Sequence, residues 1–285
     1  MSKLVFITGV SSGIGLHATR SLINKGYTVI GSVRNAVTAT SLKQELGSSF
    51  IPLVFDVRDR QETELQIGTL RSLLDQSGLY ALVNNAGVVA AGPLQVLPDE
   101  DFETVMDVNV LAVRRVTNLL LPWLGTDKKY SPGKIINISS VSGLFNAPYN
   151  GAYCISKHAL ESMTDIYRRE LSMFGITVTA IEPGPIKSEI WSKSKGSLDR
   201  FASTAYGHLL ANADKMIENS EKSALDTAVI SNLIIRILEA DAPQTRYLVH
   251  RNKWMFRILA NWMPDKMADR LIAKTLAKGD NYRPV

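Results

Sequence analysis

Seven short runs of β-branched and aliphatic residues are spaced along the chain, with helical patterns between them. The runs are continuously apolar rather than alternating, as in parallel strands that are covered on both faces. Strands and helices that alternate in this way predict a single doubly wound α/β domain with a mostly parallel seven-stranded sheet flanked by helices. The expected strands are 4–8, 28–33, 51–56, 81–84, 134–139, 177–181 and 246–249, and the clearest helices are 101–124, 152–174 and 224–240.

The first expected strand ends in a glycine-rich turn that leads into a helix. Gly9, Gly13 and Gly15 have the spacing G-x-x-x-G-x-G, which differs from the G-x-G-x-x-G of other dinucleotide folds. Glycines at such a turn let backbone amides approach a phosphate, and the positive end of the helix dipole faces the anion. A tight turn without a ligand is the alternative, but the strand–turn–helix context favours dinucleotide binding in a Rossmann-type domain.

Tyr153 and Lys157 are four positions apart, and Ser140 precedes the tyrosine by thirteen. On a helix that spacing places the tyrosine and the lysine on one face. A phenol beside an ammonium can donate and accept a proton near neutral pH, because the positive charge favours the phenolate. Alone the pair is a weak signal, since a tyrosine packed on a lysine stem gives the same spacing.

Together with other motifs, these residues make the chain similar to the short-chain dehydrogenase/reductase family. The family pattern runs T-G-x-x-x-G-I-G, N-N-A-G, an Asn, a Ser, Y-x-x-x-K and P-G. The chain carries these parts in order at 8–15, 84–87, Asn109, Ser140, Tyr153 with Lys157, and 183–184, and the resemblance spans residues 3 to about 250. Residues 150–161 and 181–184 look most like the hydroxysteroid and retinol dehydrogenase branch.

The resemblance implies a role for each of four catalytic positions. Tyr153 would be the general acid/base, and Lys157 would lower its pKa and bind the nicotinamide ribose. Ser140 would hydrogen-bond the same substrate oxygen as charge develops. Asn109, on an otherwise apolar stripe, would help to hold a water that links Lys157 to solvent. An asparagine that packs the helix and bonds to backbone is the alternative.

The resemblance also implies the residues that would surround a nicotinamide dinucleotide. Asn84 would lie beside a cofactor ribose and Asp56 beside the adenine. Ser188 stands where the family usually has a threonine near the carboxamide. Besides Tyr153 and Lys157, the expected cofactor-binding residues are Gly9, Ser11, Ser12, Gly13, Ile14, Gly15, Arg34, Asp56, Val57, Asn84, Ala86, Gly87, Pro183, Gly184, Ile186 and Ser188.

The end of the second strand indicates which dinucleotide is bound. An acidic residue there would bond the adenosine ribose diol and repel a 2′-phosphate. Val33 occupies the position, and Arg34, whose planar guanidinium suits a phosphate, follows it. We therefore expect NADP(H) to be preferred over NAD(H), with a solvated surface arginine as the alternative.

Residues 1–250 are expected to form the dinucleotide-binding and catalytic domain, and 251–285 a helical extension packed on it. The irregular segment at about 185–222 predicts a substrate lid. With 88–98 and 141–151 it would surround a small, apolar substrate, a steroid-, retinoid- or fatty-ketone-like secondary alcohol or ketone. The residues that favour an apolar pocket are Leu144, Phe145, Tyr149, Ile190, Trp191, Phe201, Tyr206 and Leu209.

The C-terminal extension carries an apolar stripe at helical spacing that ends at Pro264. Together with neighbouring arginines and lysines, the segment 251–266 could make weak contact with an anionic membrane surface. Core, lid and subunit contact are the alternatives. By analogy with the family, a homodimer or homotetramer would pair through the helices at 101–124 and 152–174. The stripe consists of Trp254, Met255, Ile258, Leu259, Trp262 and Met263.

Composition argues against several other classes. The chain has a formal charge of +5, yet residues 246–285 alone hold nine Lys and Arg and three Asp, so the excess is local and forms no nucleic-acid stripe. Its single cysteine, Cys154, fits a reducing compartment, and no secretory signal or membrane-spanning run is found. The four histidines have no metal-ligand spacing. We expect a cytoplasmic protein with no nucleic-acid partner and no metal.

Two rivals remain from the residues alone. A catalytically silent sensor or scaffold could keep the fold, but such proteins usually break the Ser/Tyr/Lys set, which is whole here. A sugar-nucleotide epimerase or dehydratase also uses Y-x-x-x-K, although those chains are usually longer and have a different glycine spacing. An oxidoreductase acting on a CH–OH group is the leading hypothesis.

Overall fold

The computed structural model describes residues 3–187, 198–210 and 221–276. All seven predicted strands are present in one sheet, in the order β3-β2-β1-β4-β5-β6-β7. Every neighbouring pair is parallel, so the sheet is wholly rather than mostly parallel. The strands are β1 (Leu4–Ile7), β2 (Thr28–Val33), β3 (Phe50–Val54), β4 (Ala81–Asn84), β5 (Lys134–Ile138), β6 (Thr177–Pro183) and β7 (Arg246–Val249).

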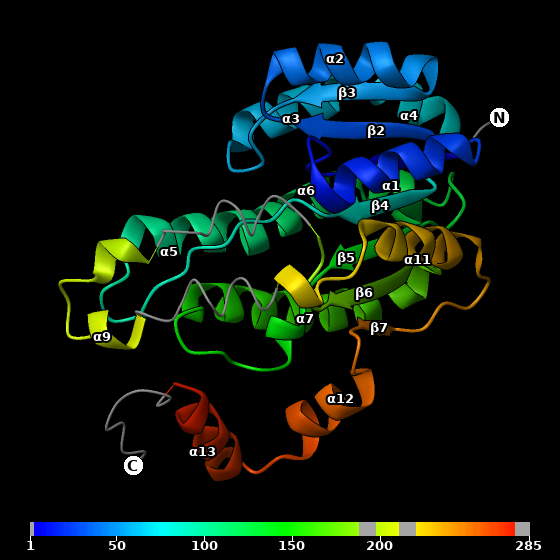
Figure 1. The fold of residues 1–285 in the computed structure, drawn as a ribbon. Helices are drawn as coiled ribbons and strands as arrows, with labels where there is room; N and C mark the ends of the chain where they lie inside the picture. The colour runs from blue at the N-terminus through cyan, green and yellow to red at the C-terminus, as the bar shows by residue number, and fades with distance from the viewer. Residues whose placement is uncertain (1–2, 188–197, 211–220, 277–285) are drawn as a thin grey trace.

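Helices cover both faces of the sheet (Figure 1). The α-helices are α1 (Gly13–Asn24), α2 (Ala36–Leu46), α3 (Arg60–Thr69), α4 (Arg71–Ser77), α5 (Asp99–Met106), α6 (Ala112–Leu120), α7 (Gly151–Leu171), α9 (Gly207–Leu210), α11 (Thr227–Glu239), α12 (Lys253–Trp262) and α13 (Asp265–Leu276). Shorter helical segments are η1 (Gly47–Ser49), η2 (Asp107–Leu111), η3 (Pro122–Thr126), η4 (Val141–Gly143), η5 (Ser172–Phe174) and η6 (Asp199–Phe201).

The continuously apolar strands contribute side chains to two hydrophobic cores, one on each face of the sheet, because successive residues of a strand point to opposite faces. Val5 and Ile7 of β1 pack with residues of α1, α2 and α11. Leu4 and Phe6 pack on the other side with residues of α3, α4, α6 and α7. The strand order reverses between β1 and β4. In doubly wound folds, ligands bind at this switch point, at the carboxyl ends of the strands.

The predicted helix at 101–124 is divided into α5, η2, α6 and η3. Residues of η2 form a turn of π-helix, a local widening that is common at functional positions. Pro122 begins η3, and Gly125, at φ 114°, takes the chain out of helical conformation. Asn109 therefore lies in a π turn rather than in a regular helix.

The C-terminal helices α12 and α13 follow β7 and lie below the sheet in Figure 1. Phe256 of α12 contacts His250 and Phe145, with ring centroids 5.4 Å and 6.4 Å away. The extension thus touches the loop that precedes α7. No helix in the described ranges combines the length and the apolar character that crossing a membrane would take.

Candidate active site

Hydrogen bonds join the turns that follow β1 and β4 to each other and to the end of β2. Thr8 Oγ1 accepts from the backbone amides of Asn85 at 2.9 Å and Ala86 at 3.0 Å, and Asn85 Nδ2 donates to the carbonyls of Thr8 and Gly9, both at 2.9 Å. Ser32 Oγ accepts from the Gly9 amide at 3.0 Å. The strand ends at the switch point are therefore fixed to one another.

The glycine turn leaves room where a side chain would collide. A Cβ atom on Gly15 would lie 2.3 Å from the Gly9 carbonyl oxygen and 2.4 Å from Asn85 Nδ2, while Gly9 and Gly13 have φ of +70° and +58°. Ser12 precedes α1, and its side chain makes no capping hydrogen bond. The first amides of α1 are thus not capped by Ser12, which fits a pyrophosphate at this helix end.

A hollow of about 400 Å³ lies beside this turn, lined by Ser11, Arg34, Asn35 and Thr38. Hydroxyls, an amide and an exposed guanidinium face it, which is a donor set suited to a phosphate. Asp56, after β3, is held by Arg58 Nη2 at 2.9 Å and by the Arg58 amide at 2.9 Å. The hydrogen bond from Arg58 is the main cause that keeps the pKa of Asp56 below its usual range, and Arg34 adds to it.

Ser140, Tyr153 and Lys157 meet at the carboxyl end of β5. Ser140 follows the strand, and its side chain lies close enough to the Tyr153 hydroxyl to oppose the rise in the pKa of that phenol. Lys157 lies one turn after Tyr153 on α7, and its Nζ is 5.5 Å from the centre of the tyrosine ring. The Lys157 ammonium donates to the Ile138 carbonyl at 2.9 Å. A proton donor, a polarising hydroxyl and a buried cation are therefore adjacent.

Burial separates the pKa values of this pair. It raises the pKa of Tyr153 to about 12, against the opposing effect of Ser140. It lowers the pKa of Lys157 to about 8, against the attraction of Glu161. Lys157 is not among the groups that shift the pKa of Tyr153 here, and its ammonium is bonded to the Ile138 carbonyl. The expected lowering of the tyrosine pKa by Lys157 stays a prediction.

Asn109 is fully buried, and its side-chain amide is fully used. It donates to the Val88 carbonyl and to Ser156 Oγ, and it accepts from the Val88 amide, each at 2.9 Å. This is the backbone-bonded packing that the sequence left open as an alternative. A Cβ atom on Gly87 would lie 3.4 Å from Asn109 Oδ1 and 3.8 Å from Lys157 Nζ, so the asparagine borders the site. Its water-holding role stays a prediction.

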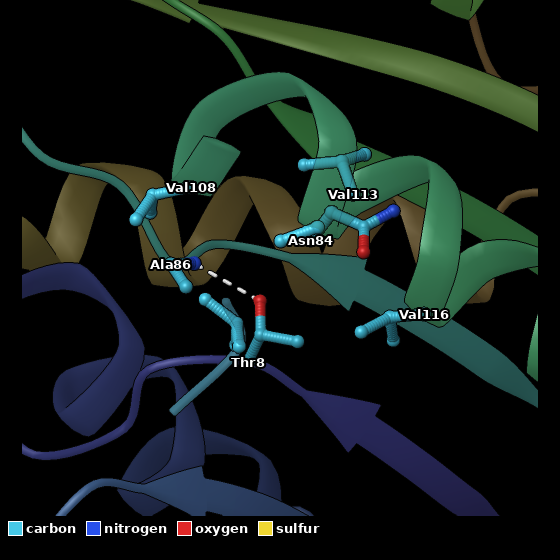
Figure 2. A pocket seen from close by; sticks show the side chains of 8 residues that line it. Thr8, Asn84, Ala86, Val108, Val113 and Val116 are labelled. Atoms are coloured by element: carbon cyan, nitrogen blue, oxygen red, sulfur yellow. Dashed lines mark hydrogen bonds between the residues drawn. The ribbon is translucent and has the colours of Figure 1, made fainter. Parts of the chain in front are cut away.

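The Asn84 side chain turns into the interior rather than toward the strand end. It donates to Thr117 Oγ1 at 3.1 Å and to Asn137 Oδ1 at 2.8 Å. The amide nitrogen is therefore used within the protein, whereas Oδ1 is buried without a hydrogen-bond partner among the described residues. The predicted ribose contact stays a prediction. Figure 2 shows Asn84 among the residues that line a narrow gap between the strand ends, η2 and α6, which has no room for a water molecule. The gap is lined by Thr8, Val57, Asn84, Ala86, Val108, Ala112, Val113 and Val116.

Residues after β6 complete the site. The Pro183 carbonyl accepts from Ser140 Oγ at 3.5 Å, and the Gly184 amide donates to the Val249 carbonyl at 2.8 Å. A Cβ atom on Gly184 would lie 2.5 Å from His250 Cδ2, so a larger residue does not fit. The Ile186 side chain is in the core, as is much of Ile14, which leaves their backbone for ligand contact. Ser188 lies outside the described residues.

The loops predicted to surround the substrate share one apolar cluster. Phe201 and Leu210, from the segment predicted as a lid, pack with Leu97 of the loop 88–98 and with Ala152 at the start of α7. Tyr149 and Tyr206 lie edge to face with ring centroids 6.4 Å apart. Phe145 contacts Phe256, which the sequence did not predict. Of the remaining pocket predictions, Ile190, Trp191 and the Leu209 side chain lie outside the described residues.

Sequence reasoning also missed a buried charge cluster formed by Glu161, Glu182 and Arg246. The available signal was a glutamate directly after the expected buried strand 177–181, where a buried carboxylate needs a partner.

The chain resembles known proteins over most of its length. The pattern of short chain dehydrogenases matches residues 3–198. The chain is 38% identical over 277 residues to the NADPH-dependent 3-dehydrocapnine reductase of Ornithobacterium rhinotracheale, which covers 97% of this chain and 98% of that protein. It is 32% identical over 286 residues to retinol dehydrogenase 16 of Homo sapiens, covering 95% and 87%.

Solved structures agree on the fold. A short-chain dehydrogenase from Streptomyces avermitilis matches with a TM-score of 0.77 at 21% identity, covering 99% of each chain. The closed form of serine dehydrogenase complexed with NADP+ matches with a TM-score of 0.72 at 25% identity, covering 86% of this chain and 94% of that one. The chain therefore belongs to the short-chain dehydrogenase/reductase family of NAD(P)-dependent oxidoreductases.

Proposed function

We propose that the protein exchanges a hydride between NADP(H) and a secondary alcohol or ketone of a lipophilic molecule. The junction of Ser140, Tyr153 and Lys157 carries this proposal, because it places a proton donor and a second hydroxyl where one substrate oxygen can reach both. When bound, the nicotinamide supplies or takes up the hydride. Tyr153 gives the proton to the oxygen on reduction, and Ser140 hydrogen-bonds that oxygen as charge develops.

The raised pKa of Tyr153 fits the role of the acid in ketone reduction at neutral pH. A phenol with a pKa of about 12 is protonated there and can act as an acid. In the oxidative direction it must first lose that proton, and the positive charge of an oxidised nicotinamide beside it would favour the phenolate. Lys157 is the nearby cation that the chain itself provides.

Selectivity for NADP(H) is supported by the hollow lined by Ser11, Arg34, Asn35 and Thr38. It lies where the second strand ends without an acidic residue. The relative from Ornithobacterium rhinotracheale is NADPH-dependent by name, and serine dehydrogenase was solved with NADP+. We propose that Arg34 holds the 2′-phosphate.

The substrate class is supported by the apolar cluster that joins the loops 88–98 and 141–151 to Phe201 and Leu210. Relatives reduce 3-dehydrocapnine or are named retinol dehydrogenases, which fits a ketone or alcohol on a larger molecule. A panel of steroid, retinoid, fatty and sugar ketones with NADPH absorbance tests the class. Conversion of sugar nucleotides without net consumption of NADPH, followed by chromatography, would favour the epimerase alternative, because such an enzyme returns the hydride to its substrate. Absence of both ketone reduction and sugar-nucleotide conversion would favour the silent sensor.

We propose two further contacts. A homodimer would pair through α5, η2, α6 and α7, where Leu111, Ile155 and Ile166 are exposed apolar side chains. Helix α12 would bind to an anionic membrane surface. Its side chains Trp254, Ile258 and Trp262 are four positions apart and are 70%, 60% and 82% exposed.

Charge complementarity favours the membrane as occupant of the α12 face. No acidic residue occurs between 251 and 264, while Arg251, Lys253 and Arg257 are present. The opposite side of the helix carries Phe256, which contacts Phe145 of the substrate loop. Docking there would bring a lipophilic substrate close to the site.

We further propose a cytoplasmic location, supported by the single cysteine, which is buried and free.

A further inference from the structure

A buried cluster of carboxylates surrounds Arg246 at the start of β7. Arg246 Nε lies 2.9 Å from Glu161 Oε2 on α7 and 3.4 Å from Glu182 Oε1 on β6, and Arg246 Nη2 lies 2.9 Å from Asp165 Oδ1. Glu161 and Glu182 are only 7% and 2% exposed. The cluster joins three elements through one guanidinium.

Arg246 contacts more carboxylates than its single positive charge balances. Asp165 has partners of its own, Arg168 at 3.2 Å and Arg169 at 3.5 Å. Glu161 and Glu182 then share Arg246 as their ion-pair partner, while Lys157 attracts Glu161 and Arg257 attracts Glu182 without forming an ion pair among the described residues. Two buried carboxylates in contact with one guanidinium are costly in a low-dielectric interior when both are ionised.

The two glutamates also leave one oxygen each without a hydrogen bond. Glu161 Oε1 and Glu182 Oε1 are both buried and have no hydrogen-bond partner among the described residues. Since both side chains face the same Arg246 Nε, they are neighbours. A proton on one carboxyl could be donated to the other, as in carboxyl pairs that share a proton.

The cluster touches the residues that position the reacting groups. A Cβ atom on Gly143 would lie 3.0 Å from Glu161 Cγ and 2.9 Å from the Lys157 carbonyl, so the turn after Ser140 rests on this part of α7. Glu182 directly precedes Pro183, whose carbonyl accepts from Ser140 Oγ. A shift of either glutamate would therefore be transmitted to Ser140.

We propose that Glu161 and Glu182 share one proton in the working enzyme and that this protonated pair, clamped by Arg246, positions Ser140 and Pro183 against α7. Both are positioning residues, since they act through others. Loss of the proton places a second negative charge in the cluster and loosens the clamp. The enzyme is then less stable and less active on the alkaline side of this titration.

The electrostatics of Glu182 give the pH window. Burial is the largest cause that raises its pKa, to about 7, and Glu161 adds to it, while Arg246 and Arg257 oppose it. Lys157 and Asp165, with the Asp165 partners Arg168 and Arg169, are the other charged groups on α7 near the cluster. A carboxyl whose pKa is raised in the fold contributes stability at low pH that is lost as pH rises through the folded value. The loss is therefore expected to finish just above pH 7.

Infrared difference spectroscopy and thermal unfolding of the full-length protein test this without turnover. The wild type should show a protonated carboxyl band that disappears between about pH 6 and about pH 8, and its Tm should fall as the pH rises from 4.5 to about 7. Glu182→Gln, which keeps a hydrogen-bond donor, should lack both changes. Glu161→Gln should move the window to lower pH, because it removes the repelling charge. Asp165→Asn should leave the band in place.

The kinetic arm rests on the proposed function. With NADPH and an accepted ketone, Glu182→Gln should keep its kcat at alkaline pH where the wild type loses it. Absence of the carboxyl band in the wild type would contradict the proposal of a shared proton. The proposal would also fail if Glu161→Gln and Glu182→Gln both kept the band and the Tm profile of the wild type. If no ketone is turned over but the band behaves as described, the proposed function fails and the shared proton stands.

Discussion

Lys157 Nζ lies 5.5 Å from the centre of the Tyr153 ring, and burial moves the two groups' pKa values in opposite directions. Burial keeps the Tyr153 hydroxyl protonated at neutral pH, and it makes the charged form of Lys157 less favourable. The amine is bonded to the Ile138 carbonyl rather than exposed to water. Separation of two titratable groups in this way is typical of sites that transfer protons.

Replacing Lys157 with methionine is expected to change the pH dependence of stability. Burial lowers its pKa from 10.5 to about 8, so the folded state loses stability as pH falls from 10.5 through 8. The cost at neutral pH is at most about 3 kcal/mol. The Tm of the wild type should therefore rise as the pH is raised from about 8 to 10.5, whereas the Tm of Lys157→Met should not. The variant should also lose turnover. Lys128→Met, at an exposed position, is the control and should follow the wild type.

Removal of the Arg34 guanidinium is expected to weaken NADP(H) selectively. A charge-assisted hydrogen bond contributes about 1.5–3 kcal/mol, so Arg34→Ala should raise KM for NADPH by about ten- to a hundredfold. The KM for NADH should stay nearly unchanged, because no 2′-phosphate is present. Steady-state kinetics with both cofactors measure this. An unchanged KM for NADPH would show that Arg34 is a solvated surface residue.

A methyl group at Gly15 is expected to disturb the glycine turn. The added Cβ would lie 2.3 Å from the Gly9 carbonyl oxygen, and overpacking of this kind costs about 1–3 kcal/mol. Gly15→Ala should lower the Tm and weaken cofactor binding in calorimetry. Gly68 in α3 is the matched control, because nothing lies within 4 Å of its added Cβ. Gly68→Ala should stabilise the protein by about 0.4–1 kcal/mol.

Serine at Trp254 and Trp262 is expected to abolish membrane contact. The wild type should sediment with vesicles that contain anionic lipid at low salt, and high salt should reduce the bound fraction. The double variant should stay in solution with its turnover of a water-soluble ketone intact. Met173→Ser, which removes another exposed side chain, is the control. If the wild type does not bind vesicles, and light scattering shows a dimer for the wild type but a monomer for the variant, the exposed face of α12 forms a contact between two copies of the chain instead.

The sheet could be predicted from the sequence because a buried parallel strand leaves a continuous apolar run. β6 extends two residues beyond its predicted end, since Glu182 and Pro183 pair with Leu248 and Val249 of β7. The break at η2 was not predicted, because the apolar stripe of the helix continues through it. Such a break depends on packing against α7 rather than on local residue types.

The candidate site could be located from motif spacing, but the directions of its side chains could not. Asn84 ends a strand, and the strand end alone does not tell whether its amide faces a ligand or the core. The carboxylate–arginine cluster joins residues that are far apart in the sequence, so no local pattern reveals it. The opposing pKa shifts likewise depend on burial, which only the fold provides.

Turnover by Tyr153→Phe, measured alongside NADPH binding, tests the proposed chemistry most directly. Loss of the proton donor should reduce kcat/KM for ketone reduction by about 10²–10⁴-fold. Fluorescence titration should show NADPH affinity close to that of the wild type, since the glycine turn and Arg34 are untouched. A variant that binds NADPH normally and still reduces ketones at the wild-type rate would contradict the assignment of Tyr153 as the acid.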